Sequence, residues 1–279
     1  LLGYHYLHGI DLWIVYIVNA ICMVSNMKLS EKPVFGGKLY HIQIAPKELP
    51  RYVLLPGDPK RTEIIADTWD SAEEIAYYRQ YRSFRGTYKG APIATLSTGI
   101  GGPATEIAII ELLYAGCDTF IRVGSTGALH EHIRIGDLII NTAAVRLDGA
   151  SHAYAPPEFP AVASLDVTLA LIIAAETLGY RYHVGVVAST DSFYCGQERI
   201  VNDYIPEFKK GLVNQLRKMR VLNFEMECST LFTIAGIFGA RAGAVNAVFA
   251  NRITGEFEKK GEKEASKVAS EAVKILYEW

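Results

Sequence analysis

The stretch Leu55-Pro-Gly-Asp-Pro-Lys-Arg61 decides the fold class, because it passes from a strand pattern to a helix pattern within one turn. It follows the apolar run 52–55, which predicts a buried strand. Asp58 can cap a helix and Pro59 suits its first turn. From residue 50 onward, short apolar runs alternate with amphipathic stretches in the same way. This alternation is typical of an α/β protein whose sheet is covered by helices on both faces.

The same reading predicts the remaining elements. Strands are expected near 52–55, 92–97, 119–124, 137–145, 183–189 and 242–250. Helices are expected to begin at 59 and 103 and to cover 165–178, 225–238 and 261–277, with Gly116 and Gly179 suited to helix ends. The stretch 200–222 interrupts this rhythm, either as an insertion beside a functional site or as a solvated surface excursion. The sequence shows no internal repeat and no linker, so we expect one domain.

Composition excludes several function classes. The chain has 279 residues, of which 50% are hydrophobic and 21% charged, as in a folded globular protein. Its formal charge of −2 implies no general attraction to nucleic acid. Cys22, Cys117, Cys195 and Cys228 lie far apart and form no C-x-x-C motif. The sequence therefore predicts no metal site and no disulfide framework, and reduced thiols favour the cytoplasm.

Residues 10–25 are the one apolar stretch that resembles a membrane or targeting segment. The stretch is short for a spanning helix, contains Asp11 and Asn19, and has no Lys or Arg before it. We therefore interpret residues 1–26 as an apolar extension and residues 27–279 as the functional domain. A membrane anchor is the alternative interpretation.

The loop Ser189-Thr-Asp-Ser-Phe-Tyr-Cys-Gly-Gln-Glu-Arg199 carries groups that match a pyrimidine base. The Gln197 amide can donate and accept, and the Arg199 guanidinium can donate to a remaining carbonyl, as the edge of uracil requires. Phe193 could stack on the face of the ring. A Gln-x-Arg pair in a loop can also be solvated or structural.

Two further segments predict an anion site. Gly57 and Arg61 lie where a strand leads into a helix, so a backbone N–H and a guanidinium could hold an oxyanion together. Arg122 lies at the end of the apolar strand 119–124, followed by Ser125, at the sheet edge where open α/β sheets bind ligands. The alternatives are an ordinary turn at Gly57 and a buried ion pair for Arg122.

The glycine-rich stretch 97–104 lacks the G-x-G-x-x-G spacing, which disfavours a dehydrogenase. Glu225 and Glu227 flank Met226 at the start of an apolar helix. Ionised carboxylates accept hydrogen bonds from vicinal hydroxyls and Met can pack against a sugar ring, although carboxylates also favour helix N-termini for structural reasons. Arg252 ends another apolar strand.

Together these segments resemble the nucleoside phosphorylase-I family, in particular its uridine-cleaving members. The resemblance runs from about Tyr40 to Leu276 and rests on the motifs PGDPKR, STGIGGPAT, FIRVGSTGAL, VRLDGAS, APPEFPAV, DSFYCGQER, NFEMEC and ANR. It implies a three-layer α/β/α domain around a mixed, partly barrel-like sheet. It also implies a hexamer, built as a trimer of dimers, whose sites are shared across the dimer.

The resemblance assigns site residues position by position. Phosphate is expected at Gly57, Arg61, Arg122 and Ser125, with Arg79 reaching in from a neighbouring subunit. Ribose is expected at Glu225, Met226 and Glu227, with His41 of the neighbour near the 5′-hydroxyl. Uracil is expected at Phe193, Gln197 and Arg199, supported by Arg252. Gln80 and Ala104 replace the glutamate and serine that help hold an intersubunit monovalent cation in the family, so that ion is in doubt.

The implied reaction is reversible phosphorolysis of uridine to uracil and ribose 1-phosphate. Arg122, Arg199 and Gln197 are the expected catalytic residues, and inorganic phosphate is a co-substrate, with no cofactor and no metal. A purine or broad-specificity nucleoside phosphorylase is the nearest alternative. A water-dependent nucleosidase would leave the predicted arginines without an anion, and a non-catalytic nucleoside-binding protein is the alternative from another class.

Overall fold

The computed structural model describes residues 32–279, which fall into two compact units. Residues 32–40 form a short antiparallel pair, β1 (Val34–Phe35) and β2 (Lys38–Leu39), joined by a turn at Gly36 and Gly37. Residues His41–Trp279 form the second unit, which holds every element discussed below. The predicted extension 1–26 lies outside the described residues. Across residues 32–279, no helix is long and apolar enough to cross a membrane.

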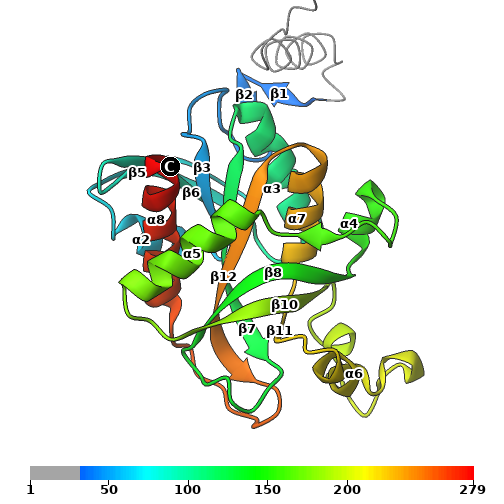
Figure 1. The fold of residues 1–279 in the computed structure, drawn as a ribbon. Coiled ribbons are helices and arrows are strands. Elements are labelled where there is room, and N and C mark those ends of the chain that lie inside the picture. Colours follow the sequence, from blue (N-terminus) through cyan, green and yellow to red (C-terminus); the bar gives the residue numbers. More distant parts are fainter. Residues whose placement is uncertain (1–31) are drawn as a thin grey trace, which may run out of the picture. The chain divides into compact units, whose positions relative to one another are not determined.

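A closed ring of strands lies at the centre of the second unit (Figure 1). Its members in spatial order are β7 (Thr119–Ala128), β12 (Arg241–Asn251), β8 (Leu138–Leu147), β10 (Tyr182–Thr190) and β11 (Asn223–Glu225). The short strand β11 closes the ring, because it pairs in parallel with β10 and antiparallel with β7. The β12–β8 pair is antiparallel, whereas β12–β7 is parallel. The predicted mixed, partly barrel-like sheet is therefore confirmed.

The sheet continues beyond the ring from the outer side of β7. The further strands, in spatial order, are β3 (Tyr52–Pro56), β6 (Ala91–Leu96), β5 (Tyr81–Tyr88) and β4 (Ser71–Tyr78). The β3–β7 pair is parallel, and the β4–β5 pair is an antiparallel hairpin. β9 (Ala161–Val162) pairs with β8. The parallel pairs bring the ends of β3 and β7 to the same edge, where the candidate site lies.

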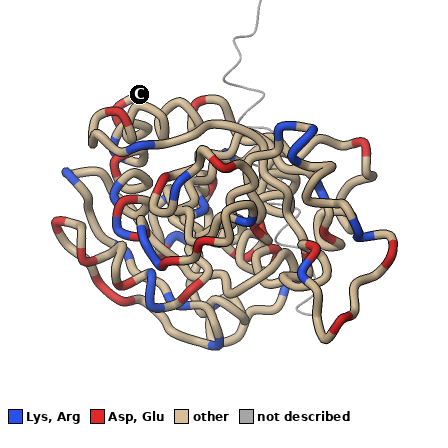
Figure 2. The backbone as a smooth tube through the Cα atoms, turned by 90° about the horizontal axis from the view of Figure 1, so that it is seen from below, with Lys and Arg blue, Asp and Glu red and all other residues tan. Residues whose placement is uncertain are grey.

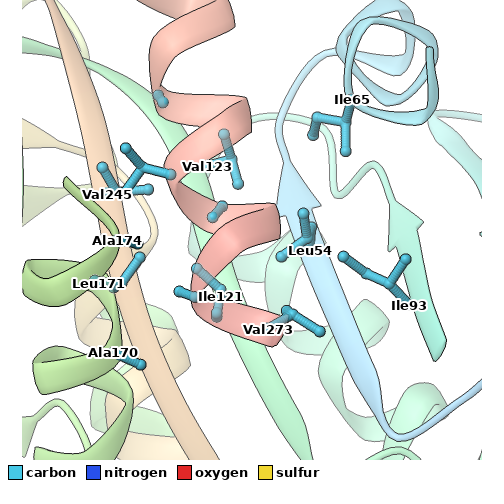
Figure 3. Close-up of a cluster of buried hydrophobic side chains, with 14 of the residues drawn as sticks. Leu54, Ile65, Ile93, Ile121, Val123, Ala170, Leu171, Ala174, Val245 and Val273 are labelled. Carbon is cyan, nitrogen blue, oxygen red and sulfur yellow. The ribbon is translucent and has the colours of Figure 1, made fainter. Parts of the chain in front are cut away.

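Helices cover the sheet from both sides, as predicted (Figure 1). One group comprises α2 (Pro59–Ala66), α5 (Leu165–Thr177) and α8 (Glu262–Glu278), and the other comprises α3 (Gly102–Ala115), α4 (Gly149–Tyr154) and α7 (Cys228–Ile237). The main apolar core fills the space between the first group and the sheet. Leu54, Ile121, Val245, Leu171 and Val273 meet there with almost no exposed surface (Figure 3).

The predicted strands and the long helices are confirmed, with ends that differ by a few residues. Two expectations were wrong. Arg122 lies inside β7 and not at its end, because pairing with β12 continues through the polar residues to Ala128. α7 begins at Cys228, because residues 223–225 form β11. Gly116 ends α3 in the left-handed conformation as predicted, with φ of 95°.

The interruption at 200–222 contains α6 (Leu212–Lys218) and the 3₁₀ turn η2 (Glu207–Lys209), and the 3₁₀ turn η1 (Cys195–Gln197) precedes it. The Glu198 carboxylate accepts hydrogen bonds from the backbone N–H groups of Gly211 and Val213, the latter at 2.6 Å. The excursion is therefore tied to the loop that carries Gln197 and Arg199. Lys and Arg are interspersed with Asp and Glu along the backbone, in keeping with the near-zero net charge (Figure 2).

Candidate active site

A cavity of about 1000 Å³ gathers most of the predicted site residues. Its walls come from the turn after β3, the second half of β7, the loop after β10, the β11–α7 junction and the end of β12. The lining includes Gly57, Arg61, Arg122, Ser125, Phe193, Gln197, Arg199, Glu225, Met226, Glu227 and Arg252. His41 and Arg79 are not among the lining residues.

One side of the cavity carries two buried guanidinium groups. Arg61, on α2, forms an ion pair with Glu262 at 2.6 Å and donates to the Val123 carbonyl at 3.1 Å. Arg122, on β7, forms an ion pair with Glu227 at 2.5 Å. Each pair fixes one edge of a planar guanidinium that still borders the cavity. The buried ion pair weighed for Arg122 is therefore present, and the same side chain lines the cavity, while phosphate binding by Arg122 stays a prediction.

Gly57 sits directly against Arg122. A Cβ at Gly57 would lie 3.0 Å from the Gly99 carbonyl oxygen and 3.5 Å from both Nη atoms of Arg122. The absence of a side chain thus lets the turn after β3 approach the guanidinium. Asp58 caps α2 by accepting from the Lys60 N–H at 2.9 Å, as the sequence predicted. The turn after β3 and the positive charge of Arg122 therefore meet at the cavity, and positive charge is what an oxyanion requires.

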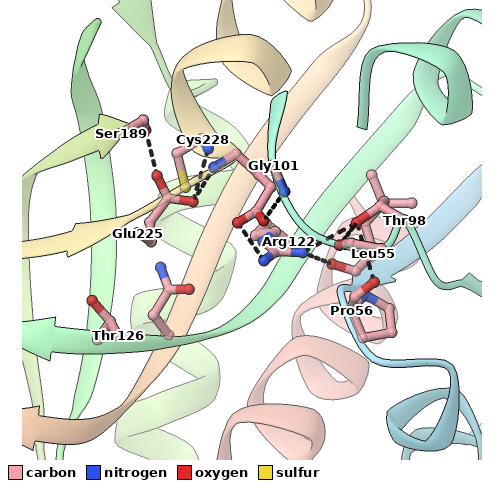
Figure 4. A network of polar contacts seen from close by, with 12 residues as sticks. Leu55, Pro56, Thr98, Gly101, Arg122, Thr126, Ser189, Glu225 and Cys228 are labelled. Atoms are coloured by element: carbon pink, nitrogen blue, oxygen red, sulfur yellow. Dashed lines mark hydrogen bonds and ion pairs between the residues drawn. The ribbon is translucent and has the colours of Figure 1, made fainter. Parts of the chain in front are cut away.

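Two carboxylates, Glu225 and Glu227, also line the cavity. Figure 4 shows Glu225 beside Ser189 and Cys228. Glu227 accepts from Arg122 and from the Gly101 N–H, the latter at 2.7 Å. Glu225 accepts from the Ser189 hydroxyl and from the N–H groups of Glu227 and Cys228, at 2.7 and 2.9 Å. Burial and the neighbouring Glu227 raise the pKa of Glu225 to about 7.

The predicted amide and guanidinium, Gln197 and Arg199, line the same cavity. Arg199 donates to the Gln197 side-chain oxygen at 2.5 Å, and the Gln197 amide nitrogen donates to the Thr190 hydroxyl at 3.2 Å. Arg252 donates to the Gln197 backbone carbonyl at 2.9 Å. Burial and the nearby Arg252 lower the pKa of Arg199 to about 10, so it stays protonated at neutral pH.

One face of the Phe193 ring is already in contact with another side chain of the protein. The Arg199 guanidinium carbon lies 3.9 Å from the centroid of the Phe193 ring, so the guanidinium covers one face of the ring. The ring remains 47% exposed at the edge of the cavity. The uncovered part of Phe193 therefore lines the cavity together with Gln197 and Arg199, and their contact with a base stays a prediction.

His41 and Arg79 lie elsewhere in this chain. The His41 ring nitrogen Nδ1 is 2.6 Å from the Glu111 carboxylate, which also accepts from the His41 N–H. Arg79 has φ of 55° and lies over the Tyr78 ring. The resemblance places both residues in a neighbour's site, and this placement stays a prediction.

Sequence reasoning missed several residues that shape the cavity. Glu262 fixes Arg61 from 201 positions away, which no local pattern indicates. The turn after Arg252 brings Glu256 and Phe257 to the cavity edge, held by a bridge between Ala250 and Phe257. Gly255, with φ of 78°, was the available signal for this turn.

Within residues 32–279, no group of three or more His, Cys, Asp or Glu side chains is arranged to hold a metal ion. The lining of the cavity instead includes the Arg61 and Arg122 guanidinium groups, the Gln197 amide, the Arg199 guanidinium and two carboxylates. Such a site can bind an oxyanion and stabilise charge on a planar base.

The sequence profile of the phosphorylase superfamily matches residues 51–278, so the chain belongs to this superfamily. It is 61% identical over 259 residues to the uridine phosphorylase of Thermococcus kodakarensis, covering 92% of this chain and 94% of that protein. It is 42% identical over 247 residues to the uridine phosphorylase of Escherichia coli, covering 85% and 98%. The guanosine phosphorylase of Halorubrum lacusprofundi is 34% identical over 215 residues, covering 77% and 84%.

Proposed function

We propose that this chain is an enzyme that catalyses the reversible phosphorolysis of uridine to uracil and ribose 1-phosphate. The observation that carries the proposal is a single cavity lined both by Arg61 and Arg122 and by Gln197 and Arg199. The relatives named uridine phosphorylase, which cover most of the chain at 42 to 61% identity, support it.

Phosphate is the nucleophile in the proposed reaction. Arg61, Arg122, Gly57 and Ser125 bind it beside the anomeric carbon of the sugar. Because each buried guanidinium is already oriented by a carboxylate, little reorganisation is needed when the anion arrives, and oriented attack contributes several kcal/mol. Displacement through an oxocarbenium-like state requires no covalent protein intermediate.

The sugar and the base are held by the remaining residues. Glu225 and Glu227 accept from the ribose hydroxyls, and Met226 packs against the ring. Negative charge develops on uracil as the glycosidic bond breaks. Arg199 and Gln197 stabilise this charge at the base edge, so a conventional general acid is unnecessary. Arg252 supports this side through the Gln197 carbonyl.

The proposal includes a homo-oligomer in which each site is shared. Arg79 and His41 of a neighbouring subunit complete the phosphate and ribose contacts, in a hexamer built as a trimer of dimers. It includes no cofactor beyond the co-substrate phosphate and no metal. Free thiols at Cys117, Cys195 and Cys228 support action in the cytoplasm.

The test is phosphate-dependent turnover followed by ultraviolet absorbance. We expect uridine to be cleaved only when phosphate is present, with ribose 1-phosphate as the sugar product. Because the amide and guanidinium match a pyrimidine edge, kcat/KM for uridine should exceed that for inosine and guanosine by on the order of 100-fold. Cleavage without phosphate indicates a nucleosidase, a preference for guanosine indicates a purine phosphorylase, and binding without cleavage indicates a non-catalytic protein.

A further inference from the structure

A chain of hydrogen-bonded polar side chains crosses the closed strand ring. The Asn246 amide nitrogen donates to Asn141 Oδ1 at 2.7 Å, and the Asn141 amide nitrogen donates to Asn223 Oδ1 at 3.0 Å. The Asn223 amide nitrogen then donates to the Thr126 hydroxyl at 2.8 Å, and that hydroxyl donates to the Phe224 carbonyl at 2.5 Å. The three asparagines have no exposed surface.

The direction of these bonds fixes the orientation of Asn246. Each amide uses its nitrogen as the donor toward the next residue, so the Asn246 carbonyl oxygen Oδ1 is left at the head of the chain. This atom is buried and has no hydrogen-bond partner within the described part of the chain. Leaving a buried carbonyl oxygen without a hydrogen bond costs folding free energy. We therefore expect its surroundings to hold a donor that could pair with it.

The side-chain donor next to this carbonyl is Arg122. Asn246 pairs with Gly124 across the β12–β7 ladder, and Arg122 is two residues before Gly124, on the same face of β7. A Cβ at Gly124 would lie 1.9 Å from Asn246 Oδ1 and 3.5 Å from Arg122 Nε. Arg122 Nε is itself buried and has no partner among residues 32–279.

We propose that Asn246 is a positioning residue for Arg122. The Nε–H of Arg122 donates to Asn246 Oδ1, directly or through one water molecule, while Glu227 holds Nη2 from the other side. Two fixed edges set the plane of the guanidinium and aim it at the anion. Gly124 provides the space for this contact. The inference rests on the proposed function, in which Arg122 binds phosphate.

Kinetics of two variants and their combination test the inference. In Asn246→Ala the acceptor is removed, and in Gly124→Ala the new methyl group displaces it. We expect each to raise KM for phosphate about 10-fold, because a misplaced guanidinium loses oriented contacts, while KM for uridine changes less than about twofold. The double variant should be no worse than Asn246→Ala, since the space is then vacated.

A matched control separates positioning from stability. Thr233→Val removes a buried hydroxyl that also has no partner within residues 32–279 and does not line the cavity. We expect it to leave KM for phosphate unchanged. If Asn246→Ala lowers only the melting temperature, or raises both KM values equally, Asn246 is merely structural and the inference is wrong.

A measurement on the wild-type protein keeps the test independent of activity and of variant folding. In a crystal structure with phosphate bound, we expect Arg122 Nε within hydrogen-bond distance of Asn246 Oδ1 or of one water that both contact. A different acceptor for Nε overturns the inference. Failure of wild-type uridine phosphorolysis would instead contradict the proposed function and leave this contact to be judged on its own.

Discussion

Arg199 combines several contacts that act on one guanidinium. It covers Phe193, donates to Gln197 and lies near Arg252, whose charge together with burial lowers the pKa of Arg199. These contacts hold the guanidinium in place before any base is bound. An arginine held in this way is suited to a charge that develops during the reaction, because no reorganisation is needed at that moment.

We therefore expect Arg199→Ala to lower kcat more than it weakens uridine binding. A loss on the order of 100-fold in kcat, with a smaller change in the dissociation constant, is expected for a donor that acts mainly in the transition state. Steady-state kinetics together with uridine titration of the free enzyme measure the two quantities. Equal losses would mean that Arg199 binds ground state and transition state alike.

At the scale of elements, one buried carboxylate anchors the start of α7. Asp148 accepts from the hydroxyls of Ser229 and Thr230 on α7 and from the N–H and hydroxyl of Ser151 on α4. Burial alone would raise the pKa of Asp148, but these hydrogen bonds outweigh it and lower the pKa. The anchor fixes the helix that begins directly after Glu227.

Replacing Asp148 with Asn should lower the free energy of unfolding by about 2–3 kcal/mol at pH 7, because hydrogen bonds to a buried charge are lost. Urea titration measures the loss. Asp166→Asn, which breaks a partly exposed pair with Arg241, is the control and should cost under about 1 kcal/mol. Similar losses in both variants would contradict the anchor.

The pH dependence of this difference has a defined sign. The folded-state pKa of Asp148 is depressed below its ordinary value of 3.8. Its contribution to stability is therefore fully present above that value and is lost as the pH falls through the folded-state pKa. The gap between wild type and Asp148→Asn should be constant above pH 5 and narrow below about pH 4.

The sequence predicted the helices and strands that have a clear local pattern of apolar residues. A buried strand such as β3 is a continuous apolar run, so its existence was clear. The β4–β5 hairpin was missed because β4 is mostly exposed and polar, and β11 was missed because three residues carry no periodicity. At the cavity, the residues that belong to sequence motifs could be predicted. Glu262 and Asn246 could not, because the residues they act on lie far away in the sequence.

At the scale of the whole molecule, the proposal that subunits share each site can be tested by mixing variants. Arg79→Ala and Arg122→Ala should each abolish most activity, the first by damaging the neighbour's site and the second by damaging its own. In a mixed dimer, one site then retains both arginines. Random mixing of equal amounts should restore about a quarter of wild-type activity.

Co-expression of differently tagged subunits, followed by isolation of the mixed oligomer, measures this recovery. Arg61→Ala mixed with Arg122→Ala is the control, because both changes fall in the same chain's cavity and no mixed site is complete. Recovery in both mixtures, or in neither, would contradict a site completed by Arg79 of a second subunit.

The closure of the strand ring by β11 also determines where Glu225 lies. β11 pairs with both β10 and β7, and its last residue is Glu225. The strand follows a long excursion, so its docking joins segments far apart along the chain. In a partly folded chain with an open ring, Glu225 is therefore not held at the cavity, and we expect such a chain to be inactive toward uridine.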